Sequence, residues 1–512
     1  MKYTLSLTRH AYRILRAHLL RDRRREQMAV TLCGLNRMQR GRAHEVRLLV
    51  RDVILLPEDA FQQQSTAHLE LKPEVQAFIH QRAYERRLIQ VDWHSHPGRG
   101  PSLAFSATDD HYEAAQAAYL VHRMDGVPYG SIVINDTALA ARLWLTKRVK
   151  AAPDKAKPEN KTAPAPRVYH PTAHPLQAIF TGDLRRTPLV GAPRRPAPVS
   201  PSDARIFDRQ VRAFGQAFQG RMGALRLGVV GLGGMGSALV EYLARLGARE
   251  WVLVDADTVE LSNLNRLVHA SVNDAQKSRP KVNVARSAIR QLSPSATVRA
   301  LAADVFSRQA LQALKSCDLL IAATDNHSSR MVLNRLAVQY LIPLVHVGFN
   351  ISVDVEGQAE SRVVSDVSGE FAIPDLGRWC LHCAGLYDPQ QAGWELASPA
   401  QRALLKQRGY VTDTPAPAVR HLDGLVAALA AAEIHNLVHA YKPQQRYLVY
   451  DALKSVLMPL NVTASETCPV CNPDHGVLGL GDLEPLPDYR RAVQVKLPPL
   501  LRKDNHGWGN TR

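Results

Sequence analysis

The stretch "LRLGVVGLGGMGSALVEYLARLG", residues 225–247, decides the fold. It begins with an almost continuous apolar run to Val230, which predicts a buried strand, and it continues from Met235 with residues typical of a helix. Glycines occupy positions 231, 233, 234 and 236 between the two segments. Glycines there let the backbone approach a ligand, and the start of the following helix presents N–H groups and a positive dipole to an anion. We therefore predict a phosphate-binding turn.

The sequence around this turn alternates between apolar runs and helical patterns. Residues 250–257 and 318–326 predict strands that end in acidic or amide residues, and residues 281–294 predict a helix. Such alternation is typical of a doubly wound, mostly parallel sheet of the Rossmann type. The back domain, residues 202–490, is therefore predicted to be α/β.

Polar residues at the predicted strand ends narrow the choice of ligand. Asp255 follows the turn by about 20 residues, where a carboxylate accepts a hydrogen bond from a ribose hydroxyl. An NAD enzyme shares this feature. Arg266 and Lys281, however, are suited to neutralise phosphates, and Asp325 at a strand end is suited to hold Mg²⁺. This set favours ATP over a nicotinamide cofactor.

Five phrases in order resemble the MoeB/ThiF/ubiquitin-activating family of adenylating enzymes: "RIFDRQVRAFG", "VVGLGGMG", "VDADTVELSNLNR", "RPKVNVAR" and "AATDN". The resemblance covers about residues 202–475 and implies contacts with ATP or Mg²⁺ from Gly231, Gly233, Gly234, Gly236, Asp255, Asp257, Ser262, Asn263, Arg266, Lys281, Asp325 and Asn326. It also implies that Asp325 is the Mg²⁺ ligand and catalytic carboxylate. Arg209 is expected to reach the phosphates from the partner subunit of a homodimer.

Six cysteines are too few for a disulfide scaffold in 512 residues. Four of them form two Cys-x-x-Cys pairs, at Cys380 and Cys383 and at Cys468 and Cys471. Four thiolates suit tetrahedral, structural Zn²⁺, and the family is known for this divided set.

In the family, the C-terminal carboxylate of a β-grasp, ubiquitin-like protein attacks the α-phosphate of ATP. Many members then transfer the acyl group to their own cysteine, but the corresponding segment here, "QRGYVTDTPAPAVRHLDG", has none. Cys317 is interpreted as a core thiol. We expect adenylation without a cysteine thioester and transfer to a partner; Thr412 or Thr414 is a less favoured acceptor.

A second motif lies at residues 93–110, "WHSHPGRGPSLAFSATDD". His94 and His96 project from one face of a predicted strand, and imidazole and carboxylate are ligands of catalytic zinc. The stretch resembles the JAMM (MPN-plus, JAB) metalloproteases. That resemblance implies Zn²⁺ held by His94, His96 and Asp109, an oxyanion-stabilising Ser106 and Glu26 as general base. Asp110 stays open as an alternative ligand to Asp109.

The chain is predicted to divide into four parts. Residues 1–149 form an α+β front domain, 150–201 a proline-rich basic linker, 202–490 the back domain and 491–512 a tail. Eleven of the 32 prolines lie between Pro153 and Pro201, which favours a semi-stiff spacer. Within it, "HPLQAIFTG" is a candidate docked segment. The sequence has neither a long apolar run nor a signal-peptide pattern, which favours a cytoplasmic protein without a membrane span.

The net charge of +17 is compatible with a nucleic-acid partner, but "RDRRRE", residues 21–26, has no interleaved aromatic residues for stacking on bases. A solvated basic surface is the favoured interpretation. Together, the two motif sets predict adenylation of the C-terminal glycine of a ubiquitin-like protein and zinc-dependent peptidase or isopeptidase processing of the same protein, in a bacterial pathway. A conjugating enzyme is a further candidate partner. Sulfur-carrier activation and a catalytically dead scaffold are the alternatives.

Overall fold

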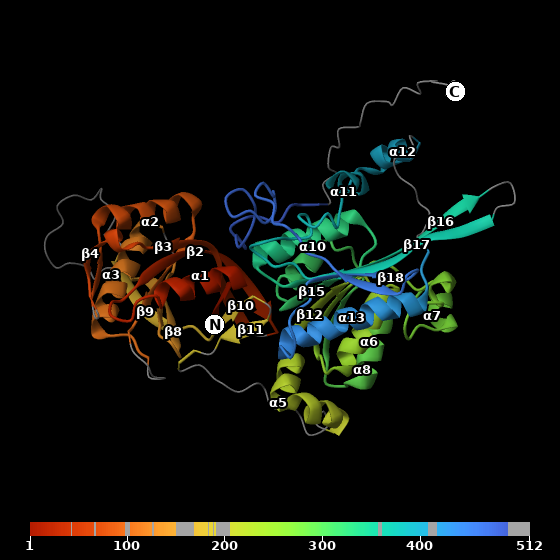
Figure 1. Ribbon diagram of the computed structural model, residues 1–512, viewed down its shortest axis with the longest axis horizontal. Helices are drawn as coiled ribbons and strands as arrows, with labels where there is room; N and C mark the ends of the chain where they lie inside the picture. Colours follow the sequence, from red (N-terminus) through yellow and green to blue (C-terminus); the bar gives the residue numbers. More distant parts are fainter. Residues whose placement is uncertain are drawn as a thin grey trace.

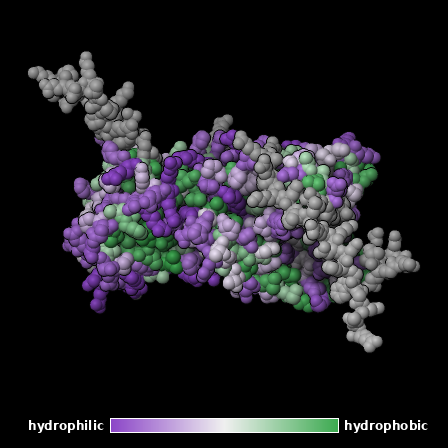
Figure 2. Space-filling view, turned by 90° about the horizontal axis from the view of Figure 1, so that it is seen from above, coloured by the Kyte–Doolittle hydropathy of each residue, from purple (hydrophilic) through white to green (hydrophobic). Residues whose placement is uncertain are grey.

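A computed structural model gives the fold of residues 1–41, 43–65, 68–97, 103–124, 127–149, 168–182, 184–187, 189–190, 205–356, 361–407 and 417–489. These residues form two α/β domains that lie side by side (Figure 1). The predicted tail, residues 491–512, lies outside the described residues. None of the helices in the described ranges is long and apolar enough to cross a bilayer. The surface seen in Figure 2 carries separate hydrophobic patches among hydrophilic side chains.

The front domain is built on a nine-stranded sheet with the order β11-β10-β1-β3-β2-β6-β7-β8-β9. Its strands are β1 (Lys2–Leu7), β2 (Met28–Arg40), β3 (Ala43–Leu55), β6 (Ile89–Ser95), β7 (Tyr129–Ile134), β8 (Leu139–Val149), β9 (Val168–Pro175), β10 (Ala178–Thr181) and β11 (Arg185–Thr187). A separate small hairpin contains β4 (Phe61–Gln64) and β5 (Leu69–Leu71) and follows the short helix η1 (Glu58–Ala60).

Alternating side chains of this sheet face two different layers of helix. Ala29 and Trp93 pack with α1 (Arg9–Leu19) on one face. Val30 packs with α2 (Pro73–Arg86) on the other face, and α3 (Ala107–Arg123) contacts β7, β8 and β9. This period-two pattern follows from the pleat of the strands.

The middle of the predicted linker belongs to the front domain, so the prediction of one spacer over residues 150–201 is wrong for this segment. β9 pairs with β8, and β10 pairs with β1 and β11. Only Leu176 and Gln177 separate β9, at one edge, from β10, which lies next to the other edge, so the sheet is strongly curved. Pro171 and Pro175 are accommodated because β9 is an edge strand with a single neighbour. Residues 150–167 and 191–201 lie outside the described residues.

The back domain has an eight-stranded sheet with the order β14-β13-β12-β15-β16-β17-β18-β19. The strands are β12 (Arg226–Val230), β13 (Glu250–Val254), β14 (Thr297–Leu301), β15 (Leu319–Ala322), β16 (Leu344–Glu356), β17 (Ser361–Ala372), β18 (Tyr447–Asp451) and β19 (Val456–Pro459). The pairs from β14 to β16 are parallel and the rest antiparallel. The predicted doubly wound sheet is therefore present, with an antiparallel extension.

Helices cover both faces of this sheet (Figure 1). They are α5 (Asp208–Ala224), α6 (Gly234–Arg245), η2 (Leu261–Asn263), α7 (Val272–Gln276), α8 (Lys281–Leu292), α9 (Arg308–Leu314), α10 (His327–Tyr340), α11 (Pro389–Glu395), α12 (Pro399–Gln407) and α13 (Arg420–His439). The strand order changes direction between β12 and β15. Open parallel sheets bind ligands at such a point, outside the carboxyl ends of the strands.

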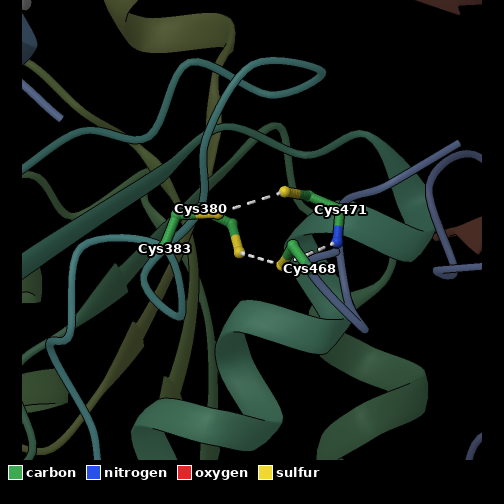
Figure 3. A group of neighbouring side chains, drawn as sticks. All are labelled: Cys380, Cys383, Cys468 and Cys471. Carbon is green, nitrogen blue, oxygen red and sulfur yellow. Dashed lines mark hydrogen bonds between the residues drawn. The ribbon is translucent and has the colours of Figure 1, made fainter. Parts of the chain in front are cut away.

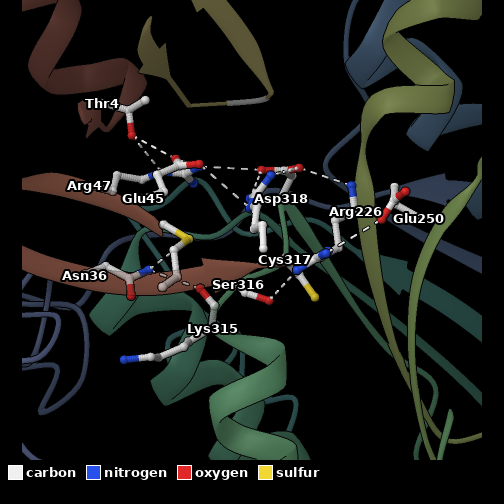
Figure 4. Close-up of polar contacts among 12 residues, drawn as sticks. Thr4, Asn36, Glu45, Arg47, Arg226, Glu250, Lys315, Ser316, Cys317 and Asp318 are labelled. Atoms are coloured by element: carbon white, nitrogen blue, oxygen red, sulfur yellow. Dashed lines mark hydrogen bonds and ion pairs between the residues drawn. The ribbon is translucent and has the colours of Figure 1, made fainter. Parts of the chain in front are cut away.

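A carboxylate with 12% of its side chain exposed joins the two domains (Figure 4). Asp318, just before β15, accepts two hydrogen bonds from Arg40 of the front domain, at 2.6 and 3.1 Å. Arg47 lies 3.6 Å from the same carboxylate, and the backbone N–H of Arg226 donates to it at 3.1 Å. Burial raises the pKa of Asp318, but the nearby Arg40 outweighs this and holds the pKa at about 2. Asp318 is therefore ionised at neutral pH.

A second interdomain contact is made by residues 473–484, which follow the last cysteine of the back domain. Arg51 of β3 donates to three carbonyl oxygens of this segment, those of Pro473, Gly476 and Leu478, at 2.5, 3.2 and 2.8 Å. The N–H of Asp482 donates to the carbonyl of Leu35 at 2.5 Å. Gly34 has no room for a side chain, because a Cβ there would lie 2.1 Å from the Gly479 carbonyl oxygen. The segment is thus packed directly on the front sheet.

Replacing Asp318 with alanine should lower the free energy of unfolding by about 2–3 kcal/mol, because Arg40 loses two charged hydrogen bonds. Glu45 still pairs with Arg47 and lies 3.9 Å from Arg40. The urea midpoint of the full chain measures the effect. Asp208→Ala is the matched control, since Asp208 pairs with Arg212 on an exposed helix surface and such pairs contribute at most about 1 kcal/mol. Equal midpoints for the two variants would contradict this role of Asp318.

Candidate functional site

The glycine turn between β12 and α6 needs its glycines for two different reasons. Gly231 has φ of +86° and would place a Cβ 2.4 Å from the Ala323 carbonyl oxygen. A Cβ at Gly236 would lie 2.0 Å from the carbonyl oxygen of Gly231. Gly233, in contrast, faces open space. The first two glycines allow close packing, and Gly233 leaves the backbone accessible to a ligand at the helix N-terminus.

Asp255 holds the turn from the end of β13. Its carboxylate accepts hydrogen bonds from the N–H of Leu232 at 2.6 Å and from the N–H of Asp257 at 2.8 Å. Burial raises the pKa of Asp255, and the positive charge of Lys281 opposes that rise. Lys281 also lies 2.8 Å from the Asp257 carboxylate. The structure therefore brings the predicted residues Asp255, Asp257 and Lys281 together beside the turn.

The residues after β13 have clear local contacts. Asn263 is buried and accepts from the N–H of Glu260 at 3.3 Å. Ser262 is exposed and its hydroxyl bonds Glu260 at 3.2 Å. The Arg266 guanidinium donates to the Ser262 carbonyl at 2.9 Å, and its Cβ lies 3.5 Å from the position of a Cβ at Gly234. Arg266 is thus the member of this group nearest the glycine turn.

The remaining predicted residues follow β15 or lie on α5. Asp325 is exposed, two residues after Ala323, whose carbonyl contacts Gly231. Asn326 caps α10 by accepting from the N–H of Ser329 at 2.8 Å. Arg209 is exposed on α5, so its contact with a partner subunit stays a prediction.

Two charged residues at this turn were missed from the sequence, Arg420 and Asp423 in the first turn of α13. The Oδ2 atom of Asp423 is buried without a hydrogen-bond partner and would lie 1.9 Å from a Cβ at Gly234. The Nη1 atom of Arg420 is also buried and unpaired. Burial raises the pKa of Asp423 to about 6, although Arg266 and Arg420 oppose the rise. No sequence signal distinguished this residue, because α13 also contains a second buried acid, Glu433, and several histidines.

The front domain assembles a second site where β6 ends and α3 begins. The Nε2 atoms of His94 and His96 lie 3.2 Å apart, and Asp109 lies 3.3 Å from His94 and 3.6 Å from His96. Ligands at about 2.0–2.1 Å from a tetrahedral Zn²⁺ are about 3.3 Å apart. The three residues form a group able to hold a metal ion. Burial would raise the pKa of Asp109, but hydrogen bonds from His94 and His96 outweigh it and keep the pKa far below its usual range.

The contacts around this triad decide between Asp109 and Asp110 as its carboxylate. Asp110 forms an ion pair with Arg142, and the group whose ligand atoms lie within 4.8 Å of one another contains Asp109 with His94 and His96. Ser106 caps α3, and its hydroxyl donates to Asp109 at 2.8 Å. Glu26 precedes β2, is 7% exposed and lies 3.8 Å from His96. Ser106 and Glu26 therefore both lie beside the His94, His96 and Asp109 group.

The four predicted cysteines converge from two loops of the back domain (Figure 3). Cys380 lies 3.8 Å from Cys468, and Cys383 lies 3.5 Å from Cys471. Thiolates at about 2.3 Å from a tetrahedral Zn²⁺ are about 3.8 Å apart. All four sulfur atoms lie within 4.8 Å of one another, so the set fits a structural metal site.

Comparison with known proteins identifies the family of each domain. The ThiF family matches residues 207–470, more than half of the chain, and the prokaryotic homologs of the JAB domain match residues 8–144. The chain therefore belongs to the ThiF family and carries a JAB-type domain in front of its ThiF domain.

Several curated relatives align with nearly their whole length. The chain is 30% identical over 304 residues to the SAMP-activating enzyme E1 of Haloferax volcanii, covering 58% of this chain and 98% of the relative. It is 30% identical to the sulfur carrier protein adenylyltransferase of Thermus thermophilus, covering 50% and 85%. It is 27% identical to the molybdopterin-synthase adenylyltransferase of Escherichia coli, covering 54% and 99%.

Gly234→Ala should destabilise the back domain by about 1–3 kcal/mol, because the new Cβ overlaps the Asp423 carboxylate and forces it to move. Gly233→Ala is the matched control, since a Cβ there meets open space and its backbone has φ of −70°. Urea unfolding of both variants tests this difference. Loss of stability in Gly233→Ala alone would show that the contact is misassigned.

Proposed function

We propose that this chain uses ATP and Mg²⁺ to adenylate the C-terminal glycine of a β-grasp, ubiquitin-like protein, and that its front domain is a zinc-dependent peptidase or isopeptidase for the same protein. The pathway is a bacterial, cytoplasmic type of ubiquitin-like modification. The observation that carries the proposal is the presence, in one chain, of a phosphate-binding turn with its charged neighbours and a His/His/Asp triad beside a buried glutamate. The names of the relatives, which are adenylyltransferases of carrier proteins or an activating enzyme, support the first activity.

The adenylating step forms one bond and breaks another. A carboxylate oxygen of the terminal glycine attacks the α-phosphorus of ATP, and the bond to the β-phosphate breaks with release of pyrophosphate. Arg266 and Lys281 are suited to bind the triphosphate, and Asp325 is suited to hold the Mg²⁺ that offsets its charge. Positioning and electrostatic stabilisation are the main contributions of the protein. Arg209 of a partner subunit would complete the site in a homodimer.

Transfer to a cysteine of this chain is not part of the proposal. Cys33 and Cys317 are fully buried, and burial raises the pKa of each thiol to about 12, so neither is a ready nucleophile. The other four cysteines form the tetrad. Thr412 and Thr414 lie outside the described residues. The adenylate is therefore expected to pass to a separate acceptor, such as a conjugating enzyme.

Peptidase chemistry in the front domain would cut the amide bond after the same glycine. His94, His96 and Asp109 would hold Zn²⁺, which lowers the pKa of a bound water and polarises the carbonyl. Glu26 would take the proton of the water and return it to the leaving amine. Ser106 is the candidate for stabilising the oxyanion, in addition to its bond with Asp109.

Sulfur-carrier activation is the second candidate, because two of the relatives are named for sulfur-carrier or molybdopterin chemistry. The fate of the carrier separates the two: a thiocarboxylate indicates sulfur delivery, whereas an amide to a protein indicates modification. A scaffold without catalysis would bind the carrier and yield neither product.

Asp325→Ala should abolish exchange of labelled pyrophosphate into ATP in the presence of a cognate carrier, because it removes the carboxylate for Mg²⁺. Asp366→Ala, on the antiparallel extension of the sheet, is the matched control and should retain exchange. Exchange at the wild-type rate in Asp325→Ala would contradict the assignment of the nucleotide site.

Purified protein should contain two equivalents of zinc, and His94→Ala should contain one. Glu26→Gln should keep both but lose cleavage of a carrier that has a C-terminal extension by at least about 100-fold, because the amide cannot accept the proton. Metal analysis and mass spectrometry of the carrier give the two readouts. One zinc in the wild type, or full cleavage by Glu26→Gln, would leave the front domain without its proposed role.

A further inference from the structure

We propose that the carrier binds the two sites in separate encounters, so that the product of the metal site leaves the protein before its carboxylate enters the nucleotide site. The inference rests on the proposed function and concerns how its two reactions are connected. It follows from where the domain contact lies relative to each site.

In the back domain, the front domain contacts the edge of the sheet opposite to the glycine turn. Asp318 immediately precedes β15 and bonds the N–H of Arg226 at the start of β12. Gly231 follows the end of β12, and Asp325 follows the end of β15. Because β12 and β15 are parallel, their starts share one edge and their ends share the other. The seven residues from Asp318 to Asp325 correspond to about 20 Å of extended chain.

In the front domain, the contact also lies far from the metal triad. His94 pairs with Met28 at the start of β2, whereas Asn36, further along the same strand, donates to the carbonyl of Lys315 across the interface at 3.1 Å. Gly34, which touches Gly479 of the back domain, is six residues from Met28, or about 20 Å of strand. Each active site is therefore at the end of its domain that faces away from the contact.

The contact itself has the properties of a fixed joint. Arg51 is 8% exposed and satisfied by three carbonyls of the opposite domain. The Asp482 carboxylate accepts hydrogen bonds from the Lys315 ammonium, at 2.6 Å, and from the N–H of Arg37, at 2.7 Å. Closing the domains on one another would break the contacts of Arg51 and of the Arg37 N–H, and the buried Arg51 guanidinium is expensive to leave unpaired.

A carrier tail of about six residues spans at most about 20 Å. The two sites lie in opposite halves of the molecule, because Asp109 is on α3 and the glycine turn leads into α6 (Figure 1). A carrier held at the metal site therefore cannot reach the glycine turn of the same chain. The carboxylate that the peptidase produces has to be released and captured again.

An isotope-dilution experiment on the wild-type full chain tests this. A labelled carrier with a C-terminal extension is mixed with ATP and a tenfold excess of unlabelled mature carrier, and the labelled adenylate is measured by mass spectrometry in the first turnovers. Release predicts about an 11-fold decrease in labelled adenylate relative to a reaction with albumin in place of the excess carrier. An undiminished yield of labelled adenylate would overturn the proposal and show direct transfer, within one chain or across a dimer.

Two companion reactions separate failure of this inference from failure of the proposed function. The labelled precursor without ATP should be cleaved, and mature carrier with ATP should be adenylated. If either reaction is missing, the proposed function is wrong and this inference is wrong with it. If both proceed and the label is not diluted, only the separate-encounter proposal is wrong.

Discussion

The ion cluster at Asp318 is the interaction on which the arrangement of the molecule depends. A carboxylate at the amino edge of one sheet is paired with Arg40 and Arg47 from the hairpin of another, and it also accepts the first backbone N–H of β12. It therefore links the start of the nucleotide-binding strand directly to the front domain. The carboxyl ends of β12 and β15 remain free for ligands. Because the front domain contacts the opposite ends of these strands, it does not cover the glycine turn.

Both candidate sites contain charged or polar groups that the fold holds close together. Some of their hydrogen-bonding atoms have no partner among the described residues. Asp423 and Arg420 each have an unpaired polar atom buried beside the glycine turn, and His94, His96 and Asp109 lie at distances set by a common centre. Buried polar groups of this kind are costly unless something binds them. A hydrogen-bond donor or a cation fits the Asp423 carboxylate and an anion fits Arg420, whereas a metal ion fits the His94, His96 and Asp109 group.

The sequence predicted those parts of the molecule whose signal is local. The glycine turn, the strand-end acids, the histidine pair and each Cys-x-x-Cys pair lie within a few residues, and their resemblance to known family motifs related them to the chemistry. It failed for residues 168–173 and Arg185–Thr187, on either side of the expected docked segment, where prolines favoured a spacer although an edge strand tolerates them. It also missed Asp423 and Arg420, which reach the turn from about 190 residues away, and the pairing of Arg40 with Asp318. Such contacts depend on tertiary packing, which has no periodic signature in the chain.

The most direct measurement is a crystal structure of the full chain with Mg²⁺ and a non-hydrolysable ATP analogue. We expect the triphosphate to lie over Gly233, with Arg266 and Lys281 on its oxygens and the cation at Asp325, while Arg40 and Asp318 stay joined. An empty glycine turn at saturating nucleotide, or a nicotinamide cofactor bound there instead, would contradict the assignment of this domain as an adenylating enzyme.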